Sequence, residues 1–419
     1  MTQLTRSQLL SYGLFGLPLA LVALPVYVIV PQLYAGSLHL SLATVGAILL
    51  AARVLDAFID PVLGRWMDTP GERRGYPAFV LLSLPLLVVG FVALMLPPPL
   101  EQGPLAAWFG ASLVLVYVGY SLATIAHNSW GARLAQQRVA RAKLTAMREG
   151  CALVGVVIAV TLPVLAGLTG LATAFALLLL ACAALLLWRV PRASASASSE
   201  SSAKAQTTPS HWLLPLSVSR FRWLFAVYAM NGVAAAVPAT LFLFFSSDKL
   251  QLPQYSALFL LLYFVSGGIA LPLWTRLAAR TGEARAWLAA MLLAIIAFAW
   301  TSQLAAGALL PFAVICMLTG AALGADLALP PALLAGVIGA ADHSNRYEGS
   351  YFGLWSWVTK MNLALAAGIS LPLLEWMGYS PGATDDAALS ALTVGYAVLP
   401  CVLKAGAALL LWRAPLNDV

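Results

Sequence analysis

The amino-acid sequence predicts an all-α membrane protein in which twelve transmembrane helices form two six-helix bundles. Of its 419 residues, 61% are hydrophobic and only 9% are charged, whereas about 25% of the residues in a soluble domain are charged. The hydrophobic residues form repeated runs of about 20 residues, the length that one spanning helix requires. A segment rich in Ser and Ala lies near the middle of the chain and separates two series of such runs.

Each predicted span is a helix, because backbone groups in hydrocarbon must find hydrogen-bond partners within the segment. The runs also lack the alternation of apolar and polar residues that the strands of a membrane barrel show. In chain order, the predicted spans are 10–34, 43–66, 77–97, 105–130, 147–168, 170–189, 221–245, 255–278, 285–304, 309–338, 350–374 and 388–412.

The Ser- and Ala-rich segment 191–210 interrupts this series and predicts a flexible linker, since its composition cannot bury a hydrophobic core. We therefore expect an N-terminal six-helix bundle at 1–190, a cytoplasmic linker at 191–219 and a C-terminal six-helix bundle at 220–419. Repeated bundles of this kind enclose a central substrate site in many transporters.

The net charge of +7 has the distribution of a membrane topology signal. Lys249 is the only Lys or Arg in the predicted loops that follow odd-numbered spans, and these loops carry acids such as Glu101, Asp385 and Asp386. The other loops are basic, which predicts that they and both termini are cytoplasmic. We expect a multi-pass protein of the inner (plasma) membrane, monomeric, whose partners are the lipid bilayer, a small-molecule solute and a coupling cation, with no nucleic acid.

No pattern typical of an enzyme or a metalloprotein occurs in the sequence. The four cysteines lie in apolar runs without the spacing of metal ligands, and the four histidines are scattered. Neither a glycine-rich phosphate loop nor a nucleophile elbow is present. We therefore expect no enzymatic activity, no catalytic residue, no metal site and no cofactor beyond a coupling ion, H⁺ or Na⁺.

Two aspartates lie inside the second predicted span. Asp56 and Asp60 are four residues apart, so they share one face of the helix. Their carboxylates repel each other unless a cation, a proton or a basic side chain lies between them, and Arg53 can reach the same face. The group is either a cation-coupling site or a structural network that fixes this span to a neighbour. Pro61 removes a backbone hydrogen bond one turn earlier and can kink the helix beside the acids.

The loop after this span resembles the glycine–aspartate–basic motif of the major facilitator superfamily, with Gly64, Asp68, Arg73 and Arg74 in its places. The resemblance implies the major facilitator fold and a role for this loop as a cytoplasmic gate. Short cytoplasmic loops are commonly basic, so a role in topology alone is the alternative.

Within that superfamily, the second span resembles the helix-two signature of the glycoside–pentoside–hexuronide:cation symporters through Arg53, Asp56, Asp60, Pro61 and Gly64. The resemblance implies that the two aspartates hold the coupling cation. Lys360, in the eleventh predicted span, matches the place of a family lysine that faces these aspartates. About 10 residues, roughly 15 Å of helix, separate Lys360 from the nearer end of its span, which argues against a side chain that merely reaches for the interface.

Further polar and aromatic residues predict a substrate cavity. Asp326 precedes Pro330-Pro331, which predict a broken or bent helix of the kind that lines substrate paths in transporters, and helix packing is the alternative role. His127, Asn128 and Arg148 are similar to the family's polar helix-four stretch and its helix-five arginine, although a lone histidine is as often structural. Tyr120, Trp355 and Trp357 complete the predicted set, unless they are core or interfacial residues.

Four positions depart from the sugar-transporting members of the family. Pro18 and Ala126 stand where those members have acids that hold sugar hydroxyls, and Ile59 and Ala123 stand where they have parts of a sodium site. We therefore expect H⁺ rather than Na⁺ to drive alternating-access symport of a small organic solute, with a sugar or glycoside unlike melibiose as a candidate. The alternatives are transport of a lysolipid or another amphiphile, and a non-transporting membrane receptor or assembly factor.

Overall fold

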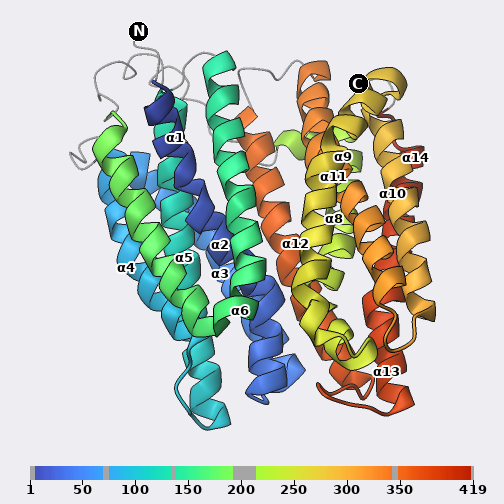
Figure 1. Cartoon of the computed structure of the whole chain (residues 1–419). Helices are drawn as coiled ribbons and strands as arrows, with labels where there is room; N and C mark the ends of the chain where they lie inside the picture. Colours follow the sequence, from blue (N-terminus) through green and yellow to red (C-terminus); the bar gives the residue numbers. More distant parts are fainter. Residues whose placement is uncertain (1–4, 69–74, 135–137, 192–213, 342–347, 417–419) are drawn as a thin grey trace. The chain divides into compact units, whose positions relative to one another are not determined.

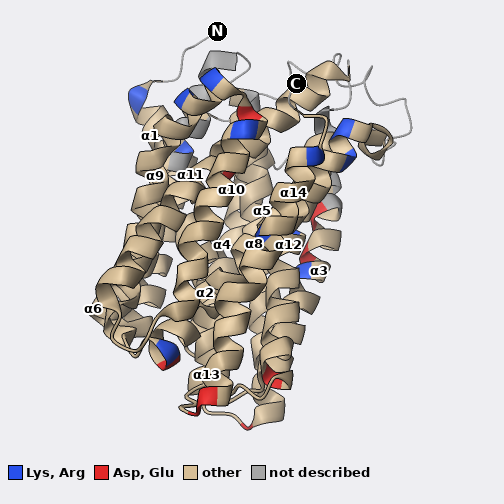
Figure 2. Cartoon of the chain, turned by 90° about the vertical axis from the view of Figure 1, so that its right-hand side faces the viewer, with Lys and Arg blue, Asp and Glu red and all other residues tan. Residues whose placement is uncertain are grey.

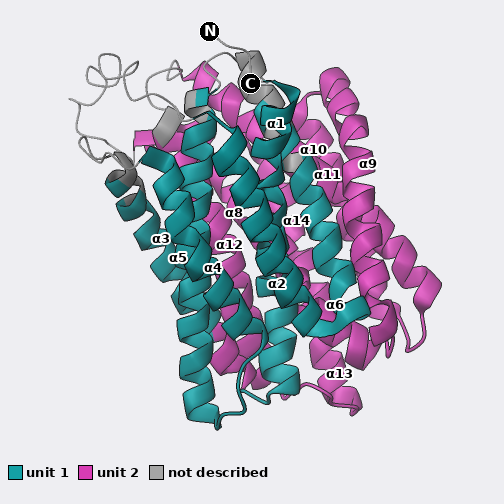
Figure 3. Cartoon of the chain, turned by 60° about the vertical axis from the view of Figure 1, so that its left-hand side comes forward, with its two compact units in different colours: residues 1–40, 47–199 teal, residues 41–46, 200–419 magenta. Residues whose placement is uncertain are grey.

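The computed structural model describes residues 5–68, 75–134, 138–191, 214–341 and 348–416, and the regular structure of these residues is entirely helical (Figure 1). The predicted all-α class is therefore confirmed. The chain divides into two compact units (Figure 3). Unit 1 comprises Met1–Leu40 and Ala47–Ser199, and unit 2 comprises Ser41–Gly46 and Glu200–Val419. Of the predicted linker, residues 192–213 lie outside the described part of the chain.

The helices of the N-terminal half are α1 (Arg6–Leu14), α2 (Gly16–Pro31), η1 (Gln32–Ser37), α3 (Leu42–Asp68), α4 (Gly75–Met95), α5 (Gln102–Leu134) and α6 (Arg138–Arg189). The chain enters α1 through a capping box, in which the side chains of Thr5 and Gln8 each accept a hydrogen bond from the other's backbone N–H. The elements α1, α2 and η1 form one apolar stretch from Arg6 to Ser37. Within unit 1, α2 packs on α6 and α4 packs on α5.

Eleven helices of the described chain are long and apolar enough to cross a membrane, whereas the sequence predicts twelve spans. The difference lies in α6, where the predicted spans 147–168 and 170–189 form one element. Its apolar stretch, Gly150–Arg189, has 40 residues, roughly 60 Å of helix and twice the thickness of a bilayer core. Gly167 has φ 67° and ψ −174°, and the chain reverses its direction there (Figure 1). α6 therefore supplies two crossings, which restores the predicted twelve.

The C-terminal half contains η3 (Leu214–Ser217), α8 (Ser219–Phe244), η4 (Phe245–Lys249), η5 (Pro253–Tyr255), α9 (Ser256–Thr281), α10 (Glu283–Ala299), η6 (Trp300–Gln303), α11 (Leu309–Ala340), α12 (Glu348–Trp376), α13 (Asp386–Thr393), η7 (Val394–Val398) and α14 (Leu399–Arg413). Pro330 and Pro331 do not break α11, although the sequence predicts a break or a bend there. The helix packs along α9 and α10, and neighbouring helices allow a membrane helix to tolerate proline.

The first membrane span of each half ends in the same turn. After the π-helical turns η1 and η4, the chain reads Leu38-His39-Leu40 and Leu250-Gln251-Leu252. His39 and Gln251 have positive φ angles of 58° and 56°, and they are the only residues other than glycine to do so in the described chain. This shared turn is a structural repeat that relates the two halves, and the Leu-x-Leu pairs are its sequence signal.

In each unit, most basic residues lie near one end of the helices, as the coloured ribbon shows (Figure 2). In unit 1 this is the end at which the chain begins, and in unit 2 it is the end at which the chain stops. Arg276 and Arg280 lie in the last turns of α9 and Arg413 ends α14, whereas Asp385 and Asp386 begin α13. Each unit therefore has a basic end, as a protein that follows the positive-inside rule requires.

Candidate functional site

Helix α3 carries three charged side chains on one face. Arg53, Asp56 and Asp60 are separated by three and four residues, a spacing that aligns side chains along a helix. Asp56 is only 2% exposed, whereas Arg53 and Asp60 are half-buried. Nη1 of Arg53 donates to Oδ2 of Asp56 at 3.3 Å. The two side chains that the sequence places within reach of each other thus form an ion pair.

A hydroxyl group from a second helix completes this contact. Oγ of Ser121, on α5, donates to Oδ1 of Asp56 at 2.7 Å. A buried carboxylate needs such donors, because burial removes the water that would otherwise solvate it. Ser121 therefore ties α5 to the charged face of α3. The sequence analysis did not select Ser121, because a single serine in an apolar helix has no distinctive pattern.

Tyrosine rings surround the guanidinium of Arg53. Its Cζ lies 4.3 Å from the ring centroid of Tyr117, within the range of a cation–π interaction. Tyr120, a predicted cavity residue on α5, is half-buried and close enough to Arg53 for an electrostatic interaction, as is Tyr27 of α2. The guanidinium therefore contacts both the Asp56 carboxylate and the ring of Tyr117.

The predicted cavity residues His127, Asn128 and Arg148 lie in two different environments. Arg148, on α6, is half-buried and donates from Nη1 to Oδ1 of the exposed Asn128. His127 is fully buried, its ring stacks on Tyr12 at a centroid distance of 4.1 Å, and its Nε2 lies 3.0 Å from the carbonyl oxygen of Tyr12. The Tyr12 hydroxyl in turn donates to the His127 carbonyl at 3.0 Å. His127 therefore packs α1 against α5, the structural alternative, and does not line an open cavity.

In unit 2, an aromatic pair packs α8 against α12. The rings of Tyr228, on α8, and Trp355, on α12, stack with centroids 3.7 Å apart. The Tyr228 hydroxyl lies 2.9 Å from Oγ1 of Thr359, which immediately precedes the half-buried Lys360. Trp357 is 42% exposed, and residues two apart on a helix do not face each other. The structure therefore separates Trp355 from Trp357, although the sequence analysis placed both in the cavity.

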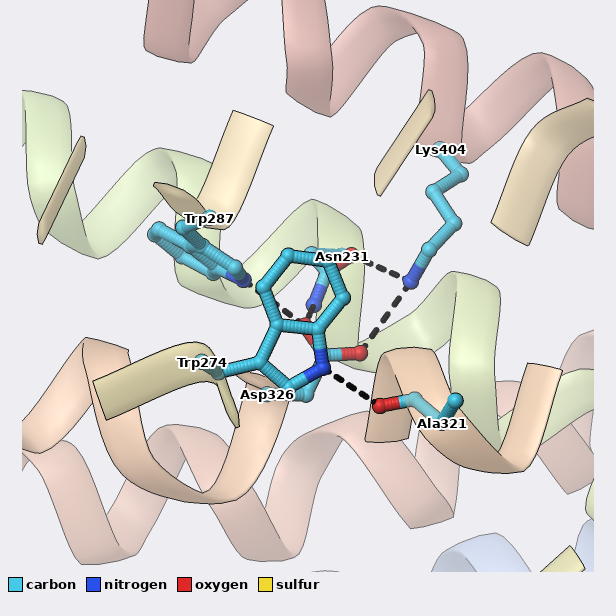
Figure 4. Close-up of polar contacts among 6 residues, drawn as sticks. All are labelled: Asn231, Trp274, Trp287, Ala321, Asp326 and Lys404. Atoms are coloured by element: carbon cyan, nitrogen blue, oxygen red, sulfur yellow. Dashed lines mark hydrogen bonds and ion pairs between the residues drawn. The ribbon is translucent and has the colours of Figure 1, made fainter. Parts of the chain in front are cut away.

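Asp326 lies at the centre of a polar network in the same unit (Figure 4). Its Oδ1 accepts from Nδ2 of Asn231 at 3.0 Å and from Nε1 of Trp287 at 2.7 Å. Its Oδ2 forms an ion pair with Nζ of Lys404 at 3.2 Å, and this ammonium also donates to Oδ1 of Asn231 at 2.7 Å. Helices α8, α10, α11 and α14 each contribute one of the four side chains.

Comparisons with known proteins identify the family of this chain. A family model described as MFS/sugar transport protein matches residues 10–418. The chain belongs to this family. The predicted major facilitator fold is therefore confirmed, and the chain is a transporter homologue and not an enzyme.

Individual relatives agree with the family match. The glucuronide carrier protein homolog of Escherichia coli (strain K12) is 26% identical over 411 residues, which cover 90% of this chain and 85% of the relative. This match confirms the resemblance to the glycoside–pentoside–hexuronide:cation symporters. Two solved structures share the fold. The nucleoside transporter NupG has a TM-score of 0.70 and 13% identity, with 98% of this chain and 100% of that chain covered. An inward-facing, unoccupied bacterial homolog of the human lysosomal transporter Spinster has a TM-score of 0.71 and 16% identity, with 97% of this chain and 95% of that chain covered.

The predicted cytoplasmic gate of this family member is described only in part. Gly64 and Asp68 lie in the last turns of α3, whereas Arg73 and Arg74 lie outside the described residues. Among the residues with described positions, no group of three or more His, Cys, Asp or Glu side chains is arranged to hold a metal ion.

Lys404 is the charged residue that the sequence analysis missed. It lies in the predicted span 388–412, and a charged side chain inside an apolar run is the signal that selected Lys360. The same criterion applied to the last span selects Lys404. Asn231 and Trp287 carry no such signal, because a single amide or indole is common in membrane helices.

Proposed function

We propose that this chain is a secondary transporter that couples the movement of a cation, a proton in preference to Na⁺, to the symport of a small organic solute by alternating access. The observation that carries the proposal is the buried contact of Asp56 with Arg53 and Ser121, with the second carboxylate, Asp60, one turn away on α3. Ionisable groups inside a membrane protein mark ion and substrate paths.

Competition between cations explains how such a site couples ion binding to movement. Two carboxylates one turn apart need positive charge nearby, and Arg53 supplies part of it. In the proposal, a cation bound at Asp56 and Asp60 weakens the contact of Asp56 with Arg53, and Lys360 is a further coupling residue by resemblance to the family. Ion occupancy then changes which helices are held together, and so which side of the membrane the site faces.

A proton fits the surroundings of Asp56 better than a metal ion does. Both oxygens of this carboxylate already accept hydrogen bonds from Arg53 and Ser121, which leaves fewer lone pairs for coordinating a metal ion. Na⁺ requires several oxygen ligands, whereas a proton needs one carboxylate oxygen. Ile59 and Ala123 supply no side-chain oxygen at the two positions that complete the family's sodium site.

The solute class follows from the family and its curated relative. The matching family is described as one of sugar transport, and the relative in Escherichia coli is named a glucuronide carrier homolog. A sugar or glycoside is therefore the solute that we propose. The basic ends of both units support cytoplasmic termini in the inner membrane, and a monomer completes the proposal.

Purified protein in liposomes tests the coupling. With 4-nitrophenyl β-D-glycosides as solutes, we expect accumulation to follow an imposed pH gradient and to be indifferent to an Na⁺ gradient. Asp60→Asn should abolish accumulation while solute exchange across the membrane at equal concentrations continues. Asp386→Asn, an exposed aspartate on α13, is the matched control and should transport normally. Normal accumulation by Asp60→Asn would refute the mechanism, and a strict need for Na⁺ at constant pH would refute proton coupling.

A further inference from the structure

The ion pair of Asp326 and Lys404 lies deep inside its helices. Lys404 is nine residues from the end of α14 at Arg413, and Asp326 is fourteen residues from the end of α11 at Ala340. These separations are roughly 14 and 21 Å of helix, which place both charges well inside an apolar core roughly 30 Å thick. Apolar side chains of similar size often stabilise a protein as well as a buried ion pair does. Stability alone therefore does not explain why charges occupy this place.

The network orients the carboxylate of Asp326 rather than merely neutralising it. Trp287 and Asn231 both donate to Oδ1, and Trp287 is fully buried. Oδ1 thus has two donors from two different helices, while Oδ2 is turned toward Lys404 (Figure 4). The carboxylate therefore accepts three hydrogen bonds, and these fix its orientation.

Both charged groups keep hydrogen-bonding capacity beyond this network. An ammonium has three donors, and the described contacts of Lys404 use two of them. Oδ2 of Asp326 accepts one of these hydrogen bonds and has a second lone pair. The side chains of Lys404 and Asp326 are 11% and 15% exposed, so the pair is not sealed. Pro330 also lacks the N–H that would bind the backbone carbonyl of Asp326.

An acceptor and a donor 3.2 Å apart match two neighbouring hydroxyl groups on a sugar ring, each of which can donate and accept. Tyr228 lies one turn before Asn231 on α8 and stacks on Trp355, and aromatic rings provide the apolar surface that the C–H face of a sugar needs. A few placed polar groups on a largely apolar wall are typical of small-molecule sites.

We propose that Asp326 and Lys404 bind adjacent hydroxyl groups of a sugar ring, with Asn231 and Trp287 as positioning residues that orient the carboxylate. This inference rests on the proposed transport of a sugar or glycoside and assigns the residues that hold it.

Calorimetric titration of the purified full-length protein with the 4-nitrophenyl β-D-glycosides of glucose, galactose, xylose and glucuronic acid tests the site. The glycoside that binds most tightly is then compared with its single-deoxy analogues. A hydrogen bond to a charged group is worth enough to expect a rise in Kd on the order of 10- to 100-fold for Asp326→Asn. One deoxy analogue should bind less tightly than the parent to the wild type but equally well to this variant, a change that a structural role would not produce.

A pair of tryptophans provides the matched control for the positioning role. Trp287→Phe removes the donor to Asp326, whereas Trp274→Phe removes a donor to the backbone carbonyl of Ala321 in the same unit, at the same distance of 2.7 Å (Figure 4). We expect Trp287→Phe to raise the Kd about 3- to 10-fold and to weaken discrimination against the deoxy analogue. Trp274→Phe should leave both measurements unchanged.

The double variant Asp326→Leu/Lys404→Met keeps the test decisive if a single variant does not fold, because it removes both charges together. It should still unfold in one cooperative thermal transition and lose glycoside binding. Wild-type binding by the folded double variant would overturn the site while leaving proton-coupled transport intact. A wild type that binds none of the four glycosides would overturn both the site and the proposed solute class.

Discussion

Replacing Arg53 by Met would remove the guanidinium that pairs with a carboxylate only 2% exposed. At the 3.3 Å separation of Nη1 and Oδ2, two unit charges attract each other by about 5 kcal/mol for an effective dielectric constant of about 20. Removing one member of a buried ion pair generally costs about 3–5 kcal/mol, because the other charge then has no compensation. We expect Arg53→Met and Asp56→Asn each to lower the free energy of unfolding by that amount.

A double variant of Arg53 and Asp56 shows whether the two side chains stabilise the protein through their contact with each other or independently. Because it buries no uncompensated charge, Arg53→Met/Asp56→Asn should be destabilised by much less than the sum of the single variants, with a coupling energy of about 3 kcal/mol. Reversible unfolding in mixed detergent micelles measures these free energies. The combination of Arg53→Met with Asp386→Asn, on α13 of unit 2, is the control and should be additive. If the losses of unfolding free energy in Arg53→Met and Asp56→Asn add up to the loss in the double variant within about 0.5 kcal/mol, the ion pair is refuted.

Two further predictions concern the backbone and a loop. Gly167→Ala should lower the free energy of unfolding by about 1–3 kcal/mol, because φ 67° and ψ −174° are accessible almost only to glycine. The control is Gly150→Ala, which should not destabilise the protein because this helical glycine has free space around it. Burial and a 2.6 Å hydrogen bond to Asp248 raise the pKa of Tyr379. Since the pKa is raised in the folded state, this contact should stabilise below about pH 10 and lose that effect as the pH rises further. Tyr379→Phe should show a smaller loss of unfolding free energy between pH 9 and about pH 11 in the same micelle assay.

The transmembrane helices were predictable because each is specified by a local property, a run of apolar side chains long enough to cross a bilayer. The reversal inside α6 was predicted for the same reason: no single helix of 40 apolar residues matches the bilayer. The position of the turn at Gly167 depends on one residue with positive φ, and only the backbone geometry reveals it. Of the break or bend predicted at Pro330 and Pro331, the break does not occur, because proline removes only one backbone hydrogen bond and packing on α9 and α10 keeps the helix continuous.

The candidate site was predictable where its residues share one helix. Arg53, Asp56 and Asp60 align through the helical repeat alone, so the sequence was enough to place them on one face. Contacts between helices were not predictable, because they depend on the rotation and depth of each helix. Ser121 meets Asp56 from α5, and His127 turns into the packing between α1 and α5 rather than toward a cavity.

The sequence by itself determined the class of this protein, a helical transporter homologue of two six-span halves with paired acids in its second helix, since run length, charge bias and helical spacing are local properties. Only the tertiary structure decided which buried charges on different helices are partners. Asp326, Lys404, Asn231 and Trp287 come from four helices of unit 2, and their separations in sequence, up to 173 residues between Asn231 and Lys404, contain no information about contact. Long-range packing brings them together, because a charge inside an apolar bundle is stable only where another helix supplies its partner.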